Sequence, residues 1–351
     1  MINTGNSLLN SIIGGSILSL ASCLNLLFKG NINGISYYFW NCLKFKDFEL
    51  NICFILGLIC CSSFCRQIYP ESNDIAFDIN TEMYSKGLSI IGFAISGFFI
   101  GFGTKMSNNC VLGHCILELP FLTKRAIFAS ISLIGCSILI ATFRSYFPFL
   151  EKDFFDKILF NIDLGIIPFC CFLGSLIILG LYLIIYISKK DWNKIKDLCY
   201  FFFIGIVFSY GFLQSGLLNR NMIIDFLTIN INWNPKMAFV LAVAIGLNFL
   251  LFKLIIKQFQ NPILSNRFDI PSGKSYDLKL IIGAGVLGLG WGFGGICPGT
   301  GIIASCIFIP QALIFVFFMA LGQFCEALSD DFLEKHLGKS LYEKFSDEVL
   351  N

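Results

Sequence analysis

Two ten-residue stretches, GFGTKMSNNC at residues 101–110 and GLGWGFGGIC at residues 288–297, decide the fold of this chain. They align without a gap, so that Cys110 matches Cys297 and two of the preceding glycines coincide. Glycine has no side chain and therefore lets backbones approach closely. A Gly-rich end of an apolar run, closed by a cysteine, occurs twice, which indicates an internal repeat.

The composition places the chain in a lipid bilayer. Of its 351 residues, 56% are hydrophobic and 14% are charged, and the mean hydropathy is +0.76. A soluble domain carries about 25% charged residues, so a soluble enzyme is excluded. The 25 Lys and Arg against 23 Asp and Glu leave no basic domain, and no nucleic acid partner is expected.

Apolar runs recur along the whole chain. A helix crosses the hydrocarbon layer with roughly 20 apolar residues, and we expect about nine such transmembrane helices. The runs lie at residues 11–28, 50–65, 88–103, 126–143, 163–187, 199–215, 237–256, 279–295 and 302–325. The sequence therefore predicts an all-α, polytopic integral membrane protein.

Four connections are rich in Gly, Asn or Pro and are too apolar for ordinary loops. They are Gly30–Trp40, Thr104–Leu119, Gly216–Ile229 and Cys297–Ser305. Irregular backbone at membrane depth is tolerated only where protein or a water-filled cavity surrounds it. Such broken segments commonly carry the site of a transporter, and we expect short re-entrant helices there.

The repeat also predicts how the chain is divided. The third and eighth runs carry the two stretches and cross a bilayer in opposite directions, which predicts an inverted repeat. We expect one transmembrane domain over 1–325, with halves at about 1–143 and 199–325 and a central span at 163–187. Residues 326–351 return to a soluble composition and are predicted to form an amphipathic tail. Lys and Arg gather on one set of alternate connections, which predicts an N-terminus outside and a C-terminus in the cytoplasm.

Cysteine is abundant, with 15 residues against two His. The spacings typical of zinc sites are missing from the sequence, so we expect no metal and no cofactor. Most of the cysteines lie inside apolar runs, where a thiol packs as a small hydrophobic group. Cys110 and Cys297 differ because both follow Gly-rich span ends, and we expect them to be functional. Cys42 and Cys115 lie near broken segments, and their role stays open.

The segment GFGTKMSNNCVLGHCILELPFLTKRAIFA, which begins at Gly101, resembles a signature of the YeeE/YedE sulphur-transport family. The segment LGLGWGFGGICPGTGI, which begins at Leu287, resembles a second motif of that family. The resemblance implies an hourglass-like fold in which cysteines at the waist contact a sulphur oxyanion, with thiosulfate first among the candidates. Carried over by motif, the contact residues are Cys110 and Cys297.

Other positions join the candidate site. Lys105 stands where the family has Arg, and His114 matches a family His; Asn109 is a further contact candidate, although both His114 and Asn109 could instead hold the turn. Gly295, Pro298 and Gly299 flank Cys297. Pro suits the first turn of a helix, and a half-helix that begins there would direct free N–H groups at an anion.

Two features depart from the simplest transport interpretation, and the role of a third residue, Arg220, has two alternatives. Thiosulfate-transporting members carry a third Cys after the first span, where this chain reads GNINGIS at 30–36. Glu118 places a carboxylate beside the motif, which would repel a dianion unless it pairs with Lys124 or Arg125. Arg220 is either an attractor of anions at the outer mouth or a solvated loop charge.

The expected function is a transporter or channel for thiosulfate or a related sulphur anion, and not an enzyme. The alternative is a membrane thiol–disulfide oxidoreductase that uses Cys110 and Cys297. Redox pairs commonly use C-x-x-C, a spacing that this chain does not contain. A receptor or structural protein that keeps the fold is a third possibility.

Overall fold

The structure is a computed structural model, which describes residues 4–68, 88–147, 167–230, 233–270, 278–306 and 310–337. The described part is helical, and strand geometry within it is limited to one isolated bridge between Asn31 and Asp269. Its nine long helices are α1 (Thr4–Lys29), α3 (Phe48–Ile68), α5 (Ile90–Met106), α6 (Lys124–Tyr146), α8 (Ile167–Ser188), α9 (Trp192–Gln214), α11 (Lys236–Gln258), α12 (Leu278–Gly294) and α14 (Pro310–Leu337).

Shorter helical elements follow four of the long ones. They are α2 (Ile35–Leu43), the π-helix η1 (Gly113–Glu118) with the 3-10 turn η2 (Leu119–Phe121), α10 (Arg220–Leu227) and α13 (Pro298–Cys306). Each lies in one of the four segments where the sequence predicts broken structure. The expectation of short helices at these places therefore agrees with the described structure.

The long helices confirm an all-α, polytopic membrane protein, but with a smaller number of full spans than expected. Among the described residues, seven helices are long and apolar enough to cross a bilayer, and an eighth span is the pair α12 and α13, bent by 45°. The helix α5 is apolar but is shorter than a usual span. The expected run at 302–325 is divided between α13 and α14.

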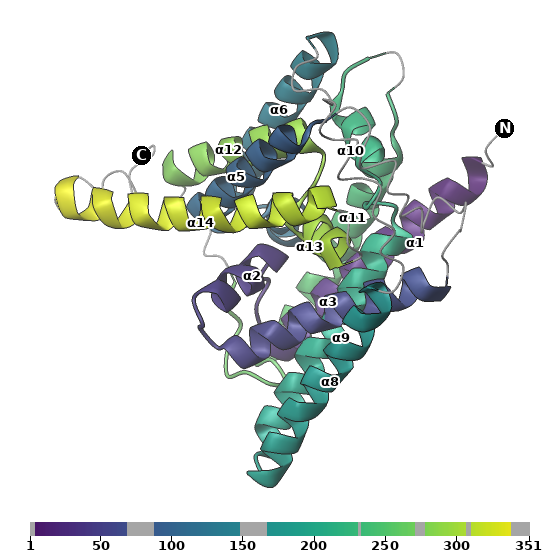
Figure 1. Ribbon diagram of the computed structural model, residues 1–351, viewed down its shortest axis with the longest axis vertical. Coiled ribbons are helices and arrows are strands. Elements are labelled where there is room, and N and C mark those ends of the chain that lie inside the picture. The colour runs from purple at the N-terminus through teal and green to yellow at the C-terminus, as the bar shows by residue number, and fades with distance from the viewer. Residues whose placement is uncertain are drawn as a thin grey trace.

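The long helices form two bundles, which Figure 1 shows side by side. The first bundle contains α1, α3, α8, α9 and α11, and the second contains α5, α6, α12 and α14. The short elements α2, α10, α13 and η1 lie between the bundles, because each of them contacts helices of both. Protein therefore surrounds the irregular backbone that lipid would not tolerate.

The order of elements in the second half repeats that of the first. The series α1, α2, α3, α5, η1, α6 corresponds to α9, α10, α11, α12, α13, α14, and α8 stands between them. The packing follows the same correspondence, since α5 packs on α14 as α12 packs on α6, and α3 packs on α9 as α11 packs on α1. The inversion of the halves across a bilayer stays a prediction.

Glycines of the repeat make matching contacts between α5 and α12. A Cβ added to Gly103 would lie 2.3 Å from the nitrogen of Leu287, and one added to Gly290 would lie 2.8 Å from the nitrogen of Ile100. In the register that aligns the two stretches, Gly103 matches Gly290 and Ile100 matches Leu287. The repeat read from the sequence is thus also a repeat of backbone contacts.

The other matched pair of glycines makes equivalent contacts with the outer helices of the second bundle. A Cβ on Gly101 would lie 1.9 Å from the carbonyl oxygen of Met319 on α14, and one on Gly288 would lie 2.3 Å from that of Leu133 on α6. Only glycine fits at these crossings, because the partner is backbone and cannot move aside.

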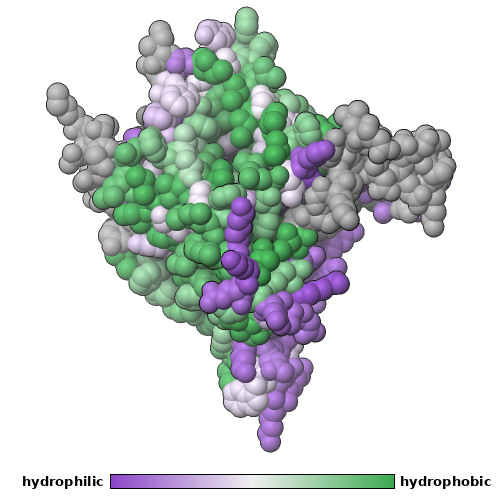
Figure 2. All heavy atoms as spheres, turned by 180° about the vertical axis from the view of Figure 1, so that it is seen from behind, coloured by the Kyte–Doolittle hydropathy of each residue, from purple (hydrophilic) through white to green (hydrophobic). Residues whose placement is uncertain are grey.

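The surface of the two bundles is apolar over much of its extent. Figure 2 shows hydrophobic residues over most of the face, with hydrophilic residues gathered toward the end where α8 joins α9. Only 6% of the most apolar window of α8 is buried inside the protein. In a membrane this face would meet lipid tails, which agrees with an integral, multi-pass location.

The helix α14 continues without a break to Leu337. The boundary at 326, where the sequence predicts the start of a separate tail, therefore falls inside α14. Residues 338–351, the rest of the predicted tail, lie outside the described residues.

Substitution of Gly101 or Gly288 by Ala is expected to lower stability, because the added methyl group meets a backbone oxygen of a packed helix. Overpacking of this kind typically costs about 1–3 kcal/mol. Thermal unfolding of the purified protein in detergent measures the effect. Gly135→Ala on α6 is the matched control, since nothing lies within 4 Å of its added Cβ. Equal melting temperatures for all three variants would contradict the packing argument.

Candidate functional site

Cys110 and Cys297 occupy the same position relative to the two short buried helices. The N–H of His114 donates to the carbonyl oxygen of Cys110 at 2.9 Å, and the N–H of Gly301 donates to that of Cys297 at 2.8 Å. Each cysteine carbonyl therefore accepts the first hydrogen bond of a helix, as the residue at a helix N-cap does. The repeat places both thiols at helix N-termini.

Polar groups of the first turn of α13 surround Cys297. Its N–H donates to Thr300 Oγ1 at 2.9 Å, and that hydroxyl also lies 3.4 Å from the Cys297 sulfur. The backbone N–H groups of Gly299 and Thr300 are within hydrogen-bonding reach of the same sulfur. Pro298 is the first residue of α13 and has no N–H to leave unsatisfied. The thiol thus lies in the positive field of a helix N-terminus.

The two cysteines lie near one another and are shielded from solvent. Cys110 is 1% exposed and Cys297 is 5% exposed, and their thiols are within electrostatic range of each other. Both belong to the free cysteines of the described structure. The structure therefore brings together the two residues that the sequence repeat marks.

The loop before α2 closes over this pair. A Cβ added to Gly34 would lie 2.8 Å from the sulfur of Cys110 and 2.7 Å from Asn109 Oδ1. One added to Gly299 would lie 2.8 Å from the side chain of Ile35. The resemblance leads one to expect a third thiol in the segment 30–36. This segment does contact Cys110, but the residue that lies against the Cys110 sulfur is Gly34.

A small cavity lies beside Gly34, between α1, α9 and the segment that leads into η1. Its volume is about 10 Å³, and its lining includes Leu112, Ile116 and Phe208. That volume holds about one water molecule. Passage of a larger solute through this region therefore requires movement of the surrounding elements.

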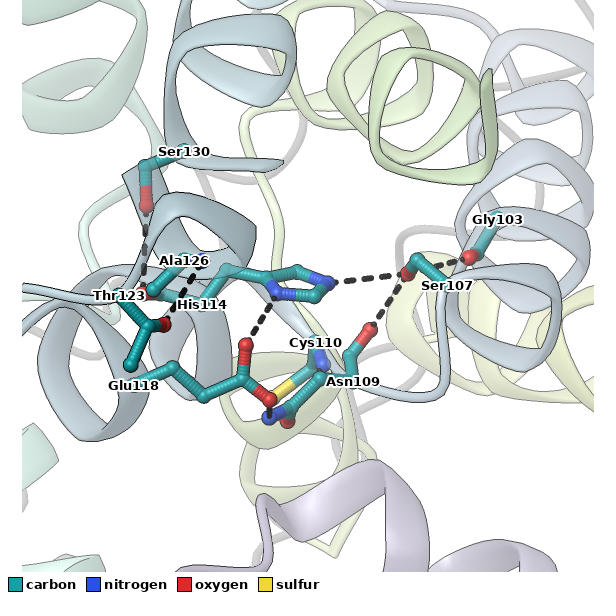
Figure 3. A network of polar contacts seen from close by, with 9 residues as sticks. All are labelled: Gly103, Ser107, Asn109, Cys110, His114, Glu118, Thr123, Ala126 and Ser130. Carbon is teal, nitrogen blue, oxygen red and sulfur yellow. Dashed lines mark hydrogen bonds and ion pairs between the residues drawn. The ribbon is translucent and has the colours of Figure 1, made fainter. Parts of the chain in front are cut away.

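A buried polar network holds the re-entrant turn that carries Cys110 (Figure 3). The ring of His114, which is 0% exposed, lies between Glu118 and Ser107. Its Nδ1 is 3.1 Å from Glu118 Oε2, and its Nε2 is 3.0 Å from Ser107 Oγ. The other oxygen of Glu118 accepts a hydrogen bond from Asn109 Nδ2 at 2.8 Å. Asn109 Oδ1 in turn accepts the N–H of Cys110 at 2.9 Å.

Glu118 therefore pairs with His114 and Asn109, and the Arg125 guanidinium is within electrostatic range of the same carboxylate. The i, i+4 spacing of His114 and Glu118 is visible in the sequence, but a histidine is a weaker signal for a carboxylate partner than two adjacent cations. Both ring nitrogens of His114 and both ends of the Asn109 amide have protein partners. A role for either residue in contacting substrate stays a prediction, while their role in holding the turn follows from these bonds.

Lys105 lies on the last turn of α5 and is directed at α2. Its Nζ is 5.0 Å from the centre of the Trp40 ring, and Lys44 Nζ lies 5.1 Å from the same ring. Two cations thus flank one indole near the re-entrant turn. The cation–π contact stabilises the ammonium group of Lys105, which keeps its positive charge.

Arg220 is buried, with 3% exposure, so it is not a solvated loop charge. Its Nε donates to the carbonyl oxygen of Gly294 at 2.6 Å, and Arg144 Nη1 donates to that of Phe293 at 2.9 Å. The two arginines therefore neutralise the carbonyl end of α12. Gly295 follows with φ of +66°, which favours glycine and turns the chain toward Cys297.

Replacement of Glu118 by Ala is expected to destabilise the protein strongly. The change removes both acceptors at once and leaves His114 Nδ1 and Asn109 Nδ2 buried without partners, and breaking a buried pair in this way costs about 3–5 kcal/mol. Thermal unfolding measures the loss. Asp331→Ala serves as the control, because Asp331 is exposed on α14. A melting temperature equal to that of the control would show that the network does not hold the turn.

Residues 197–336, from α9 to the last turn of α14, match a family of unknown function (DUF6691). Similarity also extends to transport proteins. A probable transporter of Xylella fastidiosa strain Temecula1 is 33% identical over 119 residues, which are 34% of this chain and 80% of the relative. A similar probable transporter occurs in strain 9a5c, with 33% identity over 119 residues, or 81% of its length.

A further probable transporter of strain Temecula1 is 28% identical over 138 residues, which are 39% of this chain and 94% of the relative. These relatives are less than half as long as this chain. The alignments with probable transporters and the long apolar helices both indicate a membrane protein of the transporter type. The chain therefore belongs to the family of these Xylella fastidiosa probable transporters.

Proposed function

We propose that this protein carries a small sulphur-containing anion, with thiosulfate first among the candidates, through the space between its two bundles. The observation that supports this proposal is the placement of Cys110 and Cys297, each at the N-terminus of a short buried helix and close to the other. Two thiols and two helix N-termini are thus available to one anion. The motif resemblance to the YeeE/YedE family supports the same substrate class.

The chemistry of this arrangement suits a transported anion. Helix N-termini attract negative charge, and Lys105, on the last turn of α5, adds a cation five residues before Cys110. A neutral thiol is a weak and polarisable hydrogen-bond donor. It therefore holds a sulphur anion without trapping it, and conduction needs binding weak enough for release.

The electrical work of uptake limits the mechanism. A potential that is negative inside opposes an entering anion by about 2.3 kcal/mol per charge at 100 mV. For a dianion the opposition is twice as large. Uptake of thiosulfate therefore needs a steep chemical gradient, rapid consumption inside, or the movement of a compensating cation.

Uptake of sulphur-labelled thiosulfate into proteoliposomes tests the proposal. Cys110→Ala and Cys297→Ala are each expected to reduce the initial rate at least tenfold, because each removes one of the two thiols at the constriction. Cys170→Ala is the matched control, since Cys170 is exposed on α8. Absence of uptake by the unmodified protein would overturn the substrate, and uptake that survives both substitutions would overturn the role of the thiols.

The alternative function, thiol–disulfide exchange, predicts a different result with the same variants. Since the two thiols are free and near each other, their oxidation to a disulfide would release two protons and two electrons to an acceptor. Counting free thiols before and after mild oxidation measures this. For a transporter, we expect the unmodified protein to have two more free thiols than a Cys110→Ala, Cys297→Ala double variant, both before and after mild oxidation.

A further inference from the structure

Glu326 is a carboxylate buried inside the second bundle, and the site described above does not use it. It lies on α14 and is 2% exposed. Its Oε1 is 3.5 Å from Lys279 Nζ on α12, whereas its Oε2 has no hydrogen-bond partner in the described structure. A buried carboxylate oxygen without a donor is costly, because nothing replaces the water that it has lost.

The charges around Glu326 come from α12, from α5, from α14 itself and from the residue that follows α2, whereas α13, which also packs on α14, carries no charged residue. On α12, Lys279 also pairs with Asp330 of α14. On α5, Lys105 is within electrostatic range of the Glu326 carboxylate. Directly after α2, Lys44 lies over the rings of Trp40 and Phe324, and Lys105 lies over the same Trp40 ring.

Glu326 therefore competes with an anion for Lys105. With Glu326 and Asp330 ionised, two carboxylates offset two of the three charges of Lys44, Lys105 and Lys279. An arriving dianion would therefore meet a carboxylate within electrostatic range of Lys105, the lysine that should attract it. Protonation of Glu326 removes that carboxylate and leaves the charge of Lys105 for the anion.

We propose that Glu326 binds one proton together with each transported anion, so that the protein is a proton–anion symporter. The step is the addition of one proton to the Glu326 carboxylate, at the oxygen that lacks a donor, and its release after the anion has left. Gln323, one turn earlier on the same face of α14, also has a buried oxygen without a partner. It supplies an acceptor beside the protonated acid. This inference rests on the proposed anion transport.

The other buried acid near the site is less suited to the task. Both oxygens of Glu118 accept hydrogen bonds, and His114 beside it supplies a compensating group. Its network is closed in a way that favours one fixed arrangement. Glu326 instead has one oxygen open to a proton and a neighbouring lysine whose partner changes with that proton.

Proton coupling has a measurable consequence for binding. If one proton is taken up with each anion, the half-saturating thiosulfate concentration rises by up to tenfold per pH unit once Glu326 is ionised. One proton per dianion also halves the net charge that crosses the membrane. Uptake is then driven by an inward proton gradient as well as by thiosulfate itself.

The experiment uses proteoliposomes that contain a pH-sensitive dye and a potassium and valinomycin clamp on the membrane potential. Addition of thiosulfate outside is expected to acidify the interior in the unmodified protein. Glu326→Gln mimics the protonated acid, so it is expected to retain exchange of labelled for unlabelled thiosulfate while internal acidification is lost. Asp331→Asn, an exposed acid on α14, is the matched control and should acidify the interior normally.

The outcomes separate this inference from the proposed function. Thiosulfate exchange by the unmodified protein without acidification, or acidification that persists in Glu326→Gln, overturns proton coupling through Glu326 and leaves transport standing. Absence of exchange in the unmodified protein overturns the proposed function and this inference with it. If Glu326→Gln does not fold, Glu326→Asp, which keeps a carboxyl group, is expected to acidify the interior, and loss of acidification with exchange intact would count against the proposal.

Discussion

The hydrocarbon layer offers no water to backbone N–H and C=O groups, and this constraint governs the whole structure. Long helices satisfy it internally. The broken segments cannot, so each lies between the two bundles, and side chains complete its hydrogen bonds. Thr300 accepts the N–H of Cys297, Asn109 accepts that of Cys110, and Arg220 donates to the last carbonyl of α12. The residues that satisfy the backbone are therefore also the residues that surround the candidate site.

The same constraint sorts the buried polar groups into two kinds. The network of Ser107, Asn109, His114 and Glu118 is closed by hydrogen bonds, and a closed network in a low-dielectric interior specifies one geometry. Its effect is to fix the position of Cys110. Glu326 belongs to the second kind, because one of its oxygens has no donor in the described structure. A group of that kind gains from a proton, and for that reason it suits a coupled step better than the closed network does.

Much of the fold could be predicted from the sequence, because its strongest signals are periodic. The gapless match between the two Cys-terminated stretches corresponds to contacts of Gly103 with Leu287 and of Gly290 with Ile100. Hydropathy also located the long helices, and the Gly, Asn or Pro content of four apolar connections located the broken segments. Among the described residues, seven helices and one bent pair qualify as full spans, since α5 has only 17 residues and the apolar run expected at 302–325 is divided between α13 and α14.

The site was only partly predictable, since its details depend on contacts between distant residues. The pairing of Glu118 with His114 required the turn geometry that brings Asn109 to the same carboxylate. The burial of Arg220 depended on the end of α12, which lies far along the chain. The continuation of α14 past residue 326 depends on Lys279, which pairs with Glu326 and Asp330 and makes a polar stretch part of a packed helix.

The glycine crossings described above have a mechanical consequence. At Gly101 on α5 and at Gly57 on α3, an added Cβ would meet backbone atoms of the neighbouring helix; at Gly57 it would lie 2.1 Å from the carbonyl oxygen of Phe202. At such crossings the helices touch through their main chains and have no compressible side chains between them. Such crossings resist displacement, because no side chain lies between the helices to rearrange. A cavity with room for about one water would therefore open more easily through the short elements between the bundles than through these crossings.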